Sequence, residues 1–351
     1  MKNETLRLEQ YETVRYDLNC NPFGVPKSVT NEITQYLPII GQYPDTYYEP
    51  LKNTIAEYAG CDKSHLVLGS GLSDLLRLFI ALQAPKKALI LSPTATEYEK
   101  VLSIYGCAVD TFQLDIASDF RPEVTALIAQ FDESYDMVII GNPNNPTSQI
   151  LTREEIEKIA KACKEHDIYL LIDEMYIEFT DKYEEITSVP LVADYDNLVI
   201  LRSISKFFSV PGLRLAYAIM NNETNMAIIN MTATPNNISV LTAVAVTAML
   251  KDRTYIRESK STVYTERNLI FSAMNKNRKI RLVKPYANYL LMEILDPSMT
   301  AADVLDHCRQ KGLILRNCHD FNGLNNKFVR FSVMNPSQND LLVNTILDLF
   351  T

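Results

Sequence analysis

A short glycine-containing segment could hold an anion. Gly69-Ser70-Gly71-Leu72-Ser73-Asp74 follows a predicted strand and opens a predicted helix. The backbone N–H groups of Leu72 and Ser73 would then point at a negatively charged ligand. Such strand-to-helix turns are often only turns, so this segment alone is a weak signal.

A second segment surrounds a lysine with groups that suit a phosphorylated carbonyl compound. It reads Ser203-Ile204-Ser205-Lys206-Phe207-Phe208-Ser209-Val210-Pro211-Gly212-Leu213-Arg214. The amine of Lys206 can bond covalently to an aldehyde, and the hydroxyls of Ser203 and Ser205 and the guanidinium of Arg214 can hold a phosphate. A lone lysine after a strand is ordinarily a solvated surface group, but the spacing of these hydroxyls and of the arginine from Lys206 favours a binding function.

Two more polar motifs end predicted strands between these segments. They are Asn142-Pro143-Asn144-Asn145-Pro146-Thr147 and Leu171-Ile172-Asp173-Glu174-Met175-Tyr176. Either motif could have no function: the first could be only a loop rich in turn-forming residues, and the second only an acidic residue at the end of a strand. All four motifs fall at the predicted carboxyl ends of strands, where ligands bind in open α/β sheets. We therefore expect one site.

The elements that must position these motifs alternate between β-rich runs and helical patterns. Seven runs predict strands, at residues 65–68, 88–91, 108–112, 136–140, 168–172, 197–201 and 215–220. Several are nearly continuous in Val, Ile and Leu, which is typical of parallel strands covered by helices on both faces. We predict an α/β fold with a large domain, built on a mainly parallel seven-stranded sheet between helices, plus a smaller C-terminal α+β domain.

Helix signals complete the expected organisation. Thr152-Arg153-Glu154-Glu155 is a capping box, and Pro50 suits the first turn of a helix that begins near Glu49. A long polar helix is expected over 254–275, followed by a strand at 289–294, a helix at 301–311, a strand at 328–333 and a last helix to Leu349. We predict an N-terminal segment, 1–30, that packs with the small domain, a large domain over 31–240 and the small domain over 241–351.

Composition excludes several classes of protein. The chain has 351 residues, 47% hydrophobic and 22% charged, and a formal charge of −9, which argues against a general nucleic-acid binder. No apolar run approaches the roughly 18 residues of a membrane helix. Six scattered cysteines form no Cys-x-x-Cys and match no histidine spacing, so we expect neither a metal site nor a disulfide framework. The first residues lack the apolar core of a signal peptide, and we expect a cytoplasmic protein.

The lysine segment resembles the attachment site of pyridoxal-phosphate enzymes of aminotransferase class I/II, which have fold type I. The resemblance covers essentially the whole chain and implies pyridoxal 5'-phosphate as cofactor, bound to Lys206 as a Schiff base in the 31–240 domain. It implies that Asp173 keeps the pyridine nitrogen protonated and that Asn145 and Tyr176 bond the phenolic oxygen. The remaining cofactor residues implied are Gly71, Leu72, Ser73, Ser203, Ser205 and Arg214. Tyr43 looks like a tyrosine that reaches the cofactor phosphate of the partner subunit, which implies a homodimer with shared active sites.

Two subfamilies are most similar: histidinol-phosphate aminotransferase and threonine-phosphate decarboxylase. In both, two C-terminal arginines, here Arg316 and Arg330, bind the anionic groups of the substrate, which implies a small phosphorylated amino acid or amine. Asn21 and Asn145 would also bind substrate. The bland alternative for the arginines is a pair of surface salt bridges.

Three features depart from the family pattern. Ala95 stands where an aromatic ring stacks on the cofactor, so Tyr98 becomes the candidate for that contact. Ser148 stands where glycine usually follows the Asn-Pro-Thr motif. The N-terminal segment also lacks the His-Gly-Gly stretch that helps hold substrate phosphate in the decarboxylase, which leaves the substrate open.

Both reactions would begin alike, with Lys206, Asp173 and Tyr176 as the catalytic residues, and would differ in the bond broken at Cα. Breakage of Cα–H leads to transamination, and breakage of the Cα–carboxylate bond leads to decarboxylation. We predict an aminotransferase, with decarboxylation of phosphothreonine or phosphoserine to the phosphorylated amine as the alternative. A non-catalytic, cofactor-binding sensor is a remote third interpretation, which the negative charge and the retained Lys206, Asp173 and Arg214 disfavour.

Overall fold

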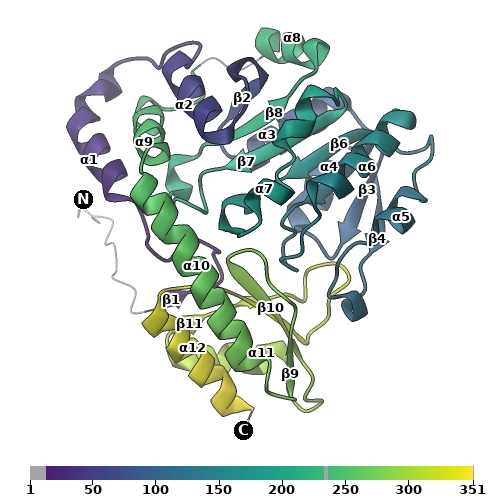
Figure 1. The fold of residues 1–351 in the computed structure, drawn as a ribbon, viewed down its shortest axis with the longest axis vertical. Helices are drawn as coiled ribbons and strands as arrows, with labels where there is room; N and C mark the ends of the chain where they lie inside the picture. The colour runs from purple at the N-terminus through teal and green to yellow at the C-terminus, as the bar shows by residue number, and fades with distance from the viewer. Residues whose placement is uncertain (1–12, 233–235, 351) are drawn as a thin grey trace, which may run out of the picture.

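A seven-stranded mixed sheet forms the centre of the computed structural model, which describes residues 13–232 and 236–350 (Figure 1). Its order is β2-β8-β7-β6-β5-β3-β4, and β8 runs antiparallel to the other six strands. The strands are β2 (Leu66–Gly69), β3 (Lys87–Ser92), β4 (Ala108–Gln113), β5 (Met137–Gly141), β6 (Tyr169–Asp173), β7 (Leu198–Ser203) and β8 (Ala216–Met220). The seven predicted strands and the mainly parallel sheet are confirmed.

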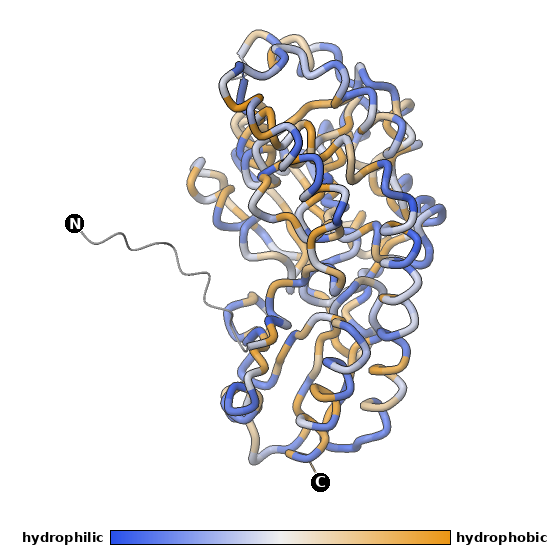
Figure 2. Tube along the Cα trace, turned by 90° about the vertical axis from the view of Figure 1, so that its left-hand side faces the viewer, coloured by the Kyte–Doolittle hydropathy of each residue, from blue (hydrophilic) through white to orange (hydrophobic). Residues whose placement is uncertain are grey.

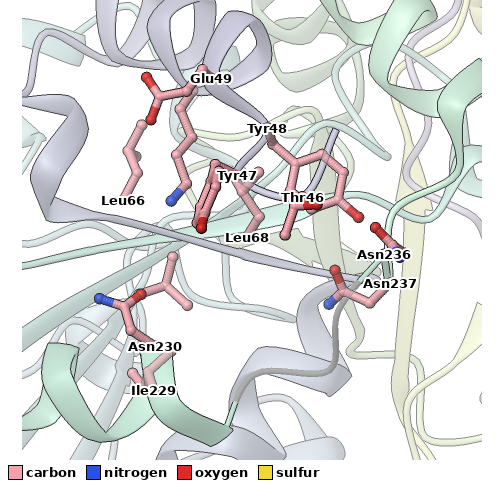
Figure 3. A pocket seen from close by; sticks show the side chains of 12 residues that line it. Thr46, Tyr47, Tyr48, Glu49, Leu66, Leu68, Ile229, Asn230, Asn236 and Asn237 are labelled. Atoms are coloured by element: carbon pink, nitrogen blue, oxygen red, sulfur yellow. The ribbon is translucent and has the colours of Figure 1, made fainter. Parts of the chain in front are cut away.

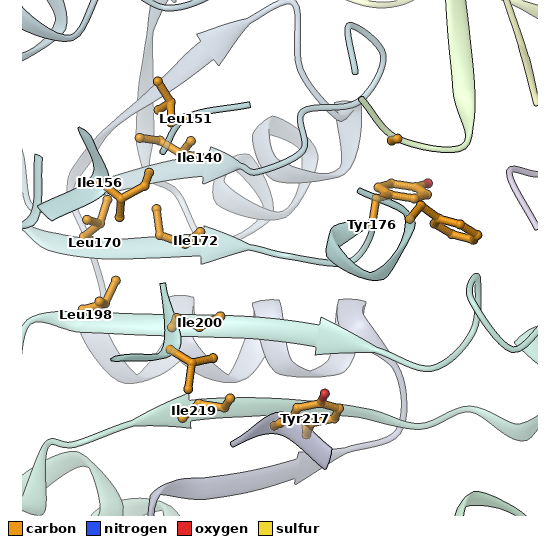
Figure 4. Close-up of a cluster of buried hydrophobic side chains, with 14 of the residues drawn as sticks. Ile140, Leu151, Ile156, Leu170, Ile172, Tyr176, Leu198, Ile200, Tyr217 and Ile219 are labelled. Carbon is orange, nitrogen blue, oxygen red and sulfur yellow. The ribbon is translucent and has the colours of Figure 1, made fainter. Parts of the chain in front are cut away.

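Helices cover both faces of this sheet because its strands are apolar on both sides. On one face, the side chains of Ile140, Ile172, Ile200 and Ile219 join one buried cluster (Figure 4). That cluster includes residues of α2 (Glu49–Ala59), α6 (Arg153–Glu165) and α9 (Val240–Leu250). The opposite face packs against α3 (Leu72–Gln83), α4 (Thr96–Ile104) and α8 (Glu223–Thr232). Each fully buried aliphatic side chain contributes about 1.5–3 kcal/mol to this packing.

The predicted helix starts are confirmed. Thr152 caps α6: its hydroxyl accepts from Glu155 N over 3.3 Å, and the Glu155 carboxylate accepts from Thr152 N over 2.8 Å. Pro50 lies in the first turn of α2, where its missing N–H has no partner to lose. The shorter helices are α1 (Lys27–Tyr36), η1 (Leu37–Gly41), η2 (Lys63–His65), η3 (Ile116–Ser118), α5 (Val124–Ile128), η4 (Ile177–Phe179), α7 (Tyr183–Ile186), η5 (Val189–Ala193) and η6 (Pro211–Leu213).

The C-terminal part has a second sheet and its own core, and lies below the large sheet in both views (Figures 1 and 2). The antiparallel order is β12-β13-β10-β9, and the long helix α10 leads into it from α9. Its elements are α10 (Arg253–Met274), β9 (Ile280–Leu282), β10 (Tyr289–Ile294), α11 (Ala301–Gln310), β11 (Leu313–Ile314), β12 (Arg316–Asn317), β13 (Phe328–Ser332) and α12 (Pro336–Leu349). The helices and strands predicted here are confirmed.

The chain near the N-terminus joins the C-terminal part. β1 (Val14–Arg15) pairs in parallel with β11. Residues 1–12 of the predicted 1–30 segment lie outside the described residues. Helix α9, which lies almost entirely within 241–351, packs against α1 and α2 (Figure 1). The limits 1–30, 31–240 and 241–351 stay a prediction.

Within residues 13–232 and 236–350, no helix has both the length and the apolar character needed to cross a membrane. The same residues contain no cluster of His, Cys, Asp and Glu suited to a metal ion. All six cysteines have free thiols.

Candidate active site

A cavity of about 310 Å³ opens at the carboxyl ends of β5, β6 and β7. It brings the four sequence motifs together, because parallel strands end at one edge of their sheet. Ten of the predicted cofactor residues line it: Leu72, Ser73, Tyr98, Asn145, Asp173, Tyr176, Ser203, Ser205, Lys206 and Arg214. Ala95 also lines it and supplies no ring.

Asp173 places a buried carboxylate in this cavity. Tyr98 Oη donates to Asp173 Oδ2 over 2.6 Å, and Met175 N donates to Asp173 Oδ1 over 2.9 Å. Gly141 leaves room for the phenol, since a Cβ there would lie 3.2 Å from Tyr98 Oη. Burial raises the pKa of Asp173 from 3.8 to about 6, although the hydrogen bonds from Tyr98 and Met175 lower it. A cationic group in the cavity would therefore be a strong partner for this carboxylate.

Lys206 is held by the chain near the N-terminus. Its Nζ donates to Leu18 O over 2.8 Å, and Asn21 N donates to Lys206 O over 3.0 Å. Asn21 Nδ2 donates to Phe207 O over 2.7 Å, so this amide is bound to the backbone beside the lysine. The prediction that Asn21 binds substrate stays a prediction.

Tyr176 completes the middle of the site. Its hydroxyl accepts from Asn19 Nδ2 over 3.3 Å, and its ring packs edge-on against Tyr289, with 4.9 Å between ring centroids. The Tyr289 hydroxyl in turn donates to Asn144 O over 2.8 Å. Residues from three distant parts of the sequence thus fix the orientation of the Tyr176 ring.

One end of the cavity is built to hold an anion. The Ser203 hydroxyl donates to Ser205 Oγ over 3.1 Å, and both side chains are buried. Arg214, with φ of 53°, brings its guanidinium over Gly71 at the start of α3. A Cβ on Gly71 would lie 2.2 Å from Arg214 Nη2, and the φ of 103° there also favours glycine. Two hydroxyls, a guanidinium and the N–H groups of a helix N-terminus therefore converge.

The two predicted substrate arginines are neighbours on the second sheet. Arg316 and Arg330 are directly opposite in the antiparallel pair β12–β13, so their side chains leave the same face. Arg330 Nη1 donates to Asn145 Oδ1, and its buried Nε has no hydrogen-bond partner among the described residues. Arg316 donates to Asp320 Oδ2 over 2.6 Å. Arg330 thus meets the cavity through Asn145.

A buried ion pair that no sequence motif predicted lies behind the cavity. Glu174 and Arg202, with side chains 0% and 1% exposed, follow Asp173 and precede Ser203 in sequence. Arg202 Nη2 donates to Glu174 Oε2 over 2.7 Å. Side chains alternate along a strand, so the pair lies on the sheet face away from Asp173 and ties the ends of β6 and β7. The sequence signal that could have predicted this pair is the acidic Glu174 and the basic Arg202 at the equivalent ends of two adjacent strands.

Tyr43 lies elsewhere. It is 88% exposed and lines a separate pocket of about 580 Å³ beside α9. Another pocket, of about 510 Å³, lies between α2, β2 and α8 and is lined by Tyr47, Asn230 and Asn237, among others (Figure 3). None of the predicted site residues lines the pocket of about 510 Å³.

Comparisons with known proteins agree with this geometry. The family model "Aminotransferase class I and II" matches residues 17–346, and the chain belongs to this family. A protein of Caldanaerobacter subterraneus subsp. tengcongensis, provisionally named threonine-phosphate decarboxylase, is 31% identical over 95% of this chain and 89% of its own length. The histidinol-phosphate aminotransferase structure from Clostridium acetobutylicum is 31% identical, with a TM-score of 0.89, and covers 96% of this chain and 98% of that one. The Sinorhizobium meliloti histidinol-phosphate aminotransferase, solved with pyridoxal-5'-phosphate, shares the fold, with a TM-score of 0.86 and 20% identity over 96% and 90% of the chains.

The protein is therefore a pyridoxal-phosphate-dependent enzyme, and the residues present fit that cofactor. Asp173 is a buried carboxylate, the kind of group that pairs with a protonated pyridine nitrogen, and Lys206 brings to the cavity an amine, the kind of group that bonds an aldehyde. Ser203, Ser205 and Arg214 match a phosphate in charge and hydrogen-bonding capacity.

Proposed function

We propose that this enzyme transaminates a small phosphorylated amino acid or amine. The observation that carries the proposal is the pair Arg316 and Arg330, directly opposite on β12 and β13, of which Arg330 is hydrogen-bonded to Asn145 of the Lys206 cavity. Two guanidiniums in one site suit a substrate with two anionic groups, such as a phosphate and a carboxylate, because a guanidinium can bind each of these groups through two parallel hydrogen bonds. The aminotransferase from Clostridium acetobutylicum, similar over almost the full chain, supports the reaction type.

The residues of the chain would divide the work as follows. Bound pyridoxal phosphate supplies an electron-accepting ring that stabilises charge at the substrate Cα. Asp173 holds the proton on the ring nitrogen, and Tyr98 and Met175 hold Asp173 in place. Lys206 Nζ moves the proton at Cα. Asn145 and Tyr176 orient the ring through its phenolic oxygen.

Decarboxylation is the second candidate. The relative at 31% identity carries the name threonine-phosphate decarboxylase, and such a reaction would use the same cavity with the Cα–carboxylate bond held perpendicular to the ring. Phosphothreonine and phosphoserine are the substrates that this candidate implies.

A homodimer with shared active sites is also part of the proposal. Tyr43 is 88% exposed and lies outside the cavity that holds Lys206, so in a single chain it reaches no cofactor. Exposed Leu37, Ile40 and Tyr47 lie close to it in sequence, and a second copy would cover such an apolar surface. We propose a cytoplasmic location, which the six free thiols support.

The substitution Arg316→Met tests the substrate class. We expect the KM for phosphoserine to rise about tenfold to a hundredfold, the effect of losing one charged hydrogen-bonding partner, while the KM for serine changes little. An equal rise for both amino acids would contradict a role of Arg316 in binding the phosphate of the substrate.

The substitution Lys206→Ala tests catalysis in the same cavity. We expect turnover to disappear and borohydride to trap no cofactor on the peptide that contains position 206, as read by mass spectrometry. Lys206→Arg keeps the charge and should behave like the alanine variant, because a guanidinium does not bond the aldehyde. Persistent turnover in either variant would remove Lys206 from its role.

A further inference from the structure

Ser148 occupies a position that its backbone makes unfavourable for any residue with a side chain. Its φ is 63°, in the left-handed region that favours glycine. It is nevertheless fully buried, at 0% exposed. A serine held in this conformation in the interior calls for a compensating interaction.

The hydroxyl of Ser148 supplies that interaction across the two parts of the molecule. Ser148 Oγ accepts from Tyr286 N over 2.9 Å and from Ala287 N over 2.7 Å. The carbonyls of the same two residues accept from Arg267 Nη1 of α10. The segment that leads into β10 is therefore hydrogen-bonded on one side to the loop 142–151, which carries Asn145, and on the other side to α10.

The two residues that Ser148 binds, Tyr286 and Ala287, lie three and two residues before Tyr289, which belongs to the site. Tyr289, just beyond Ala287, packs its ring against Tyr176. The centroid of the same ring lies 5.5 Å from Cζ of the Arg330 guanidinium. Arg330 itself donates to Asn145, three residues before Ser148. The contact at Ser148 thus fixes the spacing between the loop of the large sheet and the strand pair that carries Arg330.

We propose that Ser148 is a positioning residue that latches the β10 entry onto the Asn145 loop, so that Arg330 and Asn145 are held ready for the anionic group of the substrate. The proposal rests on the proposed function, in which Arg330 binds that group. A glycine at this position would satisfy the backbone without strain but would leave the N–H groups of Tyr286 and Ala287 without their acceptor.

Two variants separate the hydroxyl from the strain. Ser148→Gly removes both, and Ser148→Ala removes the hydroxyl but keeps the left-handed strain. Ala84→Gly is the matched control, because Ala84 also has a left-handed φ, of 43°, and is exposed at the end of α3. It relieves strain without deleting a hydrogen bond.

The first measurement is amide hydrogen exchange of the holoenzymes at Tyr286 and Ala287. We expect exchange to be about tenfold faster in both Ser148 variants and unchanged in Ala84→Gly. Unchanged exchange in the Ser148 variants would overturn the latch, and faster exchange in the alanine variant alone would assign the effect to strain and overturn it too.

The second measurement is the KM for phosphoserine, with the cofactor dissociation constant as reference. We expect both Ser148 variants to raise KM about tenfold, with kcat and cofactor affinity nearly unchanged. Faster exchange with an unchanged KM would show a purely structural contact and overturn the positioning role. If the wild-type enzyme does not turn over phosphoserine or histidinol phosphate, the proposed function fails, whereas the exchange result still decides the latch on its own.

Discussion

Replacing the buried carboxylate of Asp173 should stabilise the apoprotein while it impairs the enzyme. Asp173→Asn keeps the size of the side chain and an acceptor for Met175 N, but it removes the charge. Without cofactor, wild-type Asp173 ionises in a buried environment that raises its pKa from 3.8 to about 6. The asparagine variant avoids that cost at neutral pH.

The pKa values set both the sign and the size of the effect. The folded-state pKa of Asp173 lies above its unfolded value, so the folded protein binds more protons between these values, and wild-type stability falls as pH rises from 3.8 to about 6. The difference between the two pKa values corresponds to about 3 kcal/mol. We expect apo Asp173→Asn to exceed the wild type by up to that amount at pH 8 and to match it near pH 4.

Urea unfolding of both apoproteins at several pH values measures this difference directly. Burial also raises the pKa of Glu178, to about 7, and its titration is common to both proteins, so it cancels in the comparison. An advantage of the variant that does not grow with pH, or a variant less stable than the wild type at pH 8, would refute the reasoning. Cofactor should stabilise the wild type more than the variant.

Two further substitutions test neighbouring contacts. Tyr98→Phe removes a hydrogen bond that lowers the pKa of Asp173, so the acidic limb of cofactor binding should move to higher pH, as fluorescence titration across pH would show; an unmoved limb would contradict this role. Gly71→Ala should weaken cofactor binding at least about tenfold in equilibrium dialysis, because the new Cβ displaces Arg214. Gly212→Ala, where a Cβ would have open space, is its control, and equal affinity of the two variants would count against the Arg214 assignment.

The large sheet and the cavity were predictable because each depends on local signals. Strands of a parallel sheet buried on both faces appear as nearly continuous apolar runs, and several of the seven predicted strands have this pattern. The capping box at Thr152 depends on residues three apart and was found in place. The site motifs follow strands, so their convergence at one sheet edge follows from the topology.

What could not be predicted depends on pairs far apart in the chain. The bond from Tyr98 to Asp173 joins residues 75 positions apart, and the contacts of Ser148 reach residues 138 and 139 positions away. The sequence marked Ser148 only as a departure and gave no sign of its partners. The role proposed for Tyr43 would depend on a second chain, which no pattern within one chain specifies.

Product analysis tests the central claim most directly. Purified enzyme with pyridoxal phosphate would be offered phosphoserine, phosphothreonine or histidinol phosphate, with and without 2-oxoglutarate, and the products read by mass spectrometry. The proposed transamination predicts glutamate and a phosphorylated carbonyl product only when the oxo acid is present. A phosphorylated amine formed from a phosphorylated amino acid without the oxo acid would contradict it and establish decarboxylation.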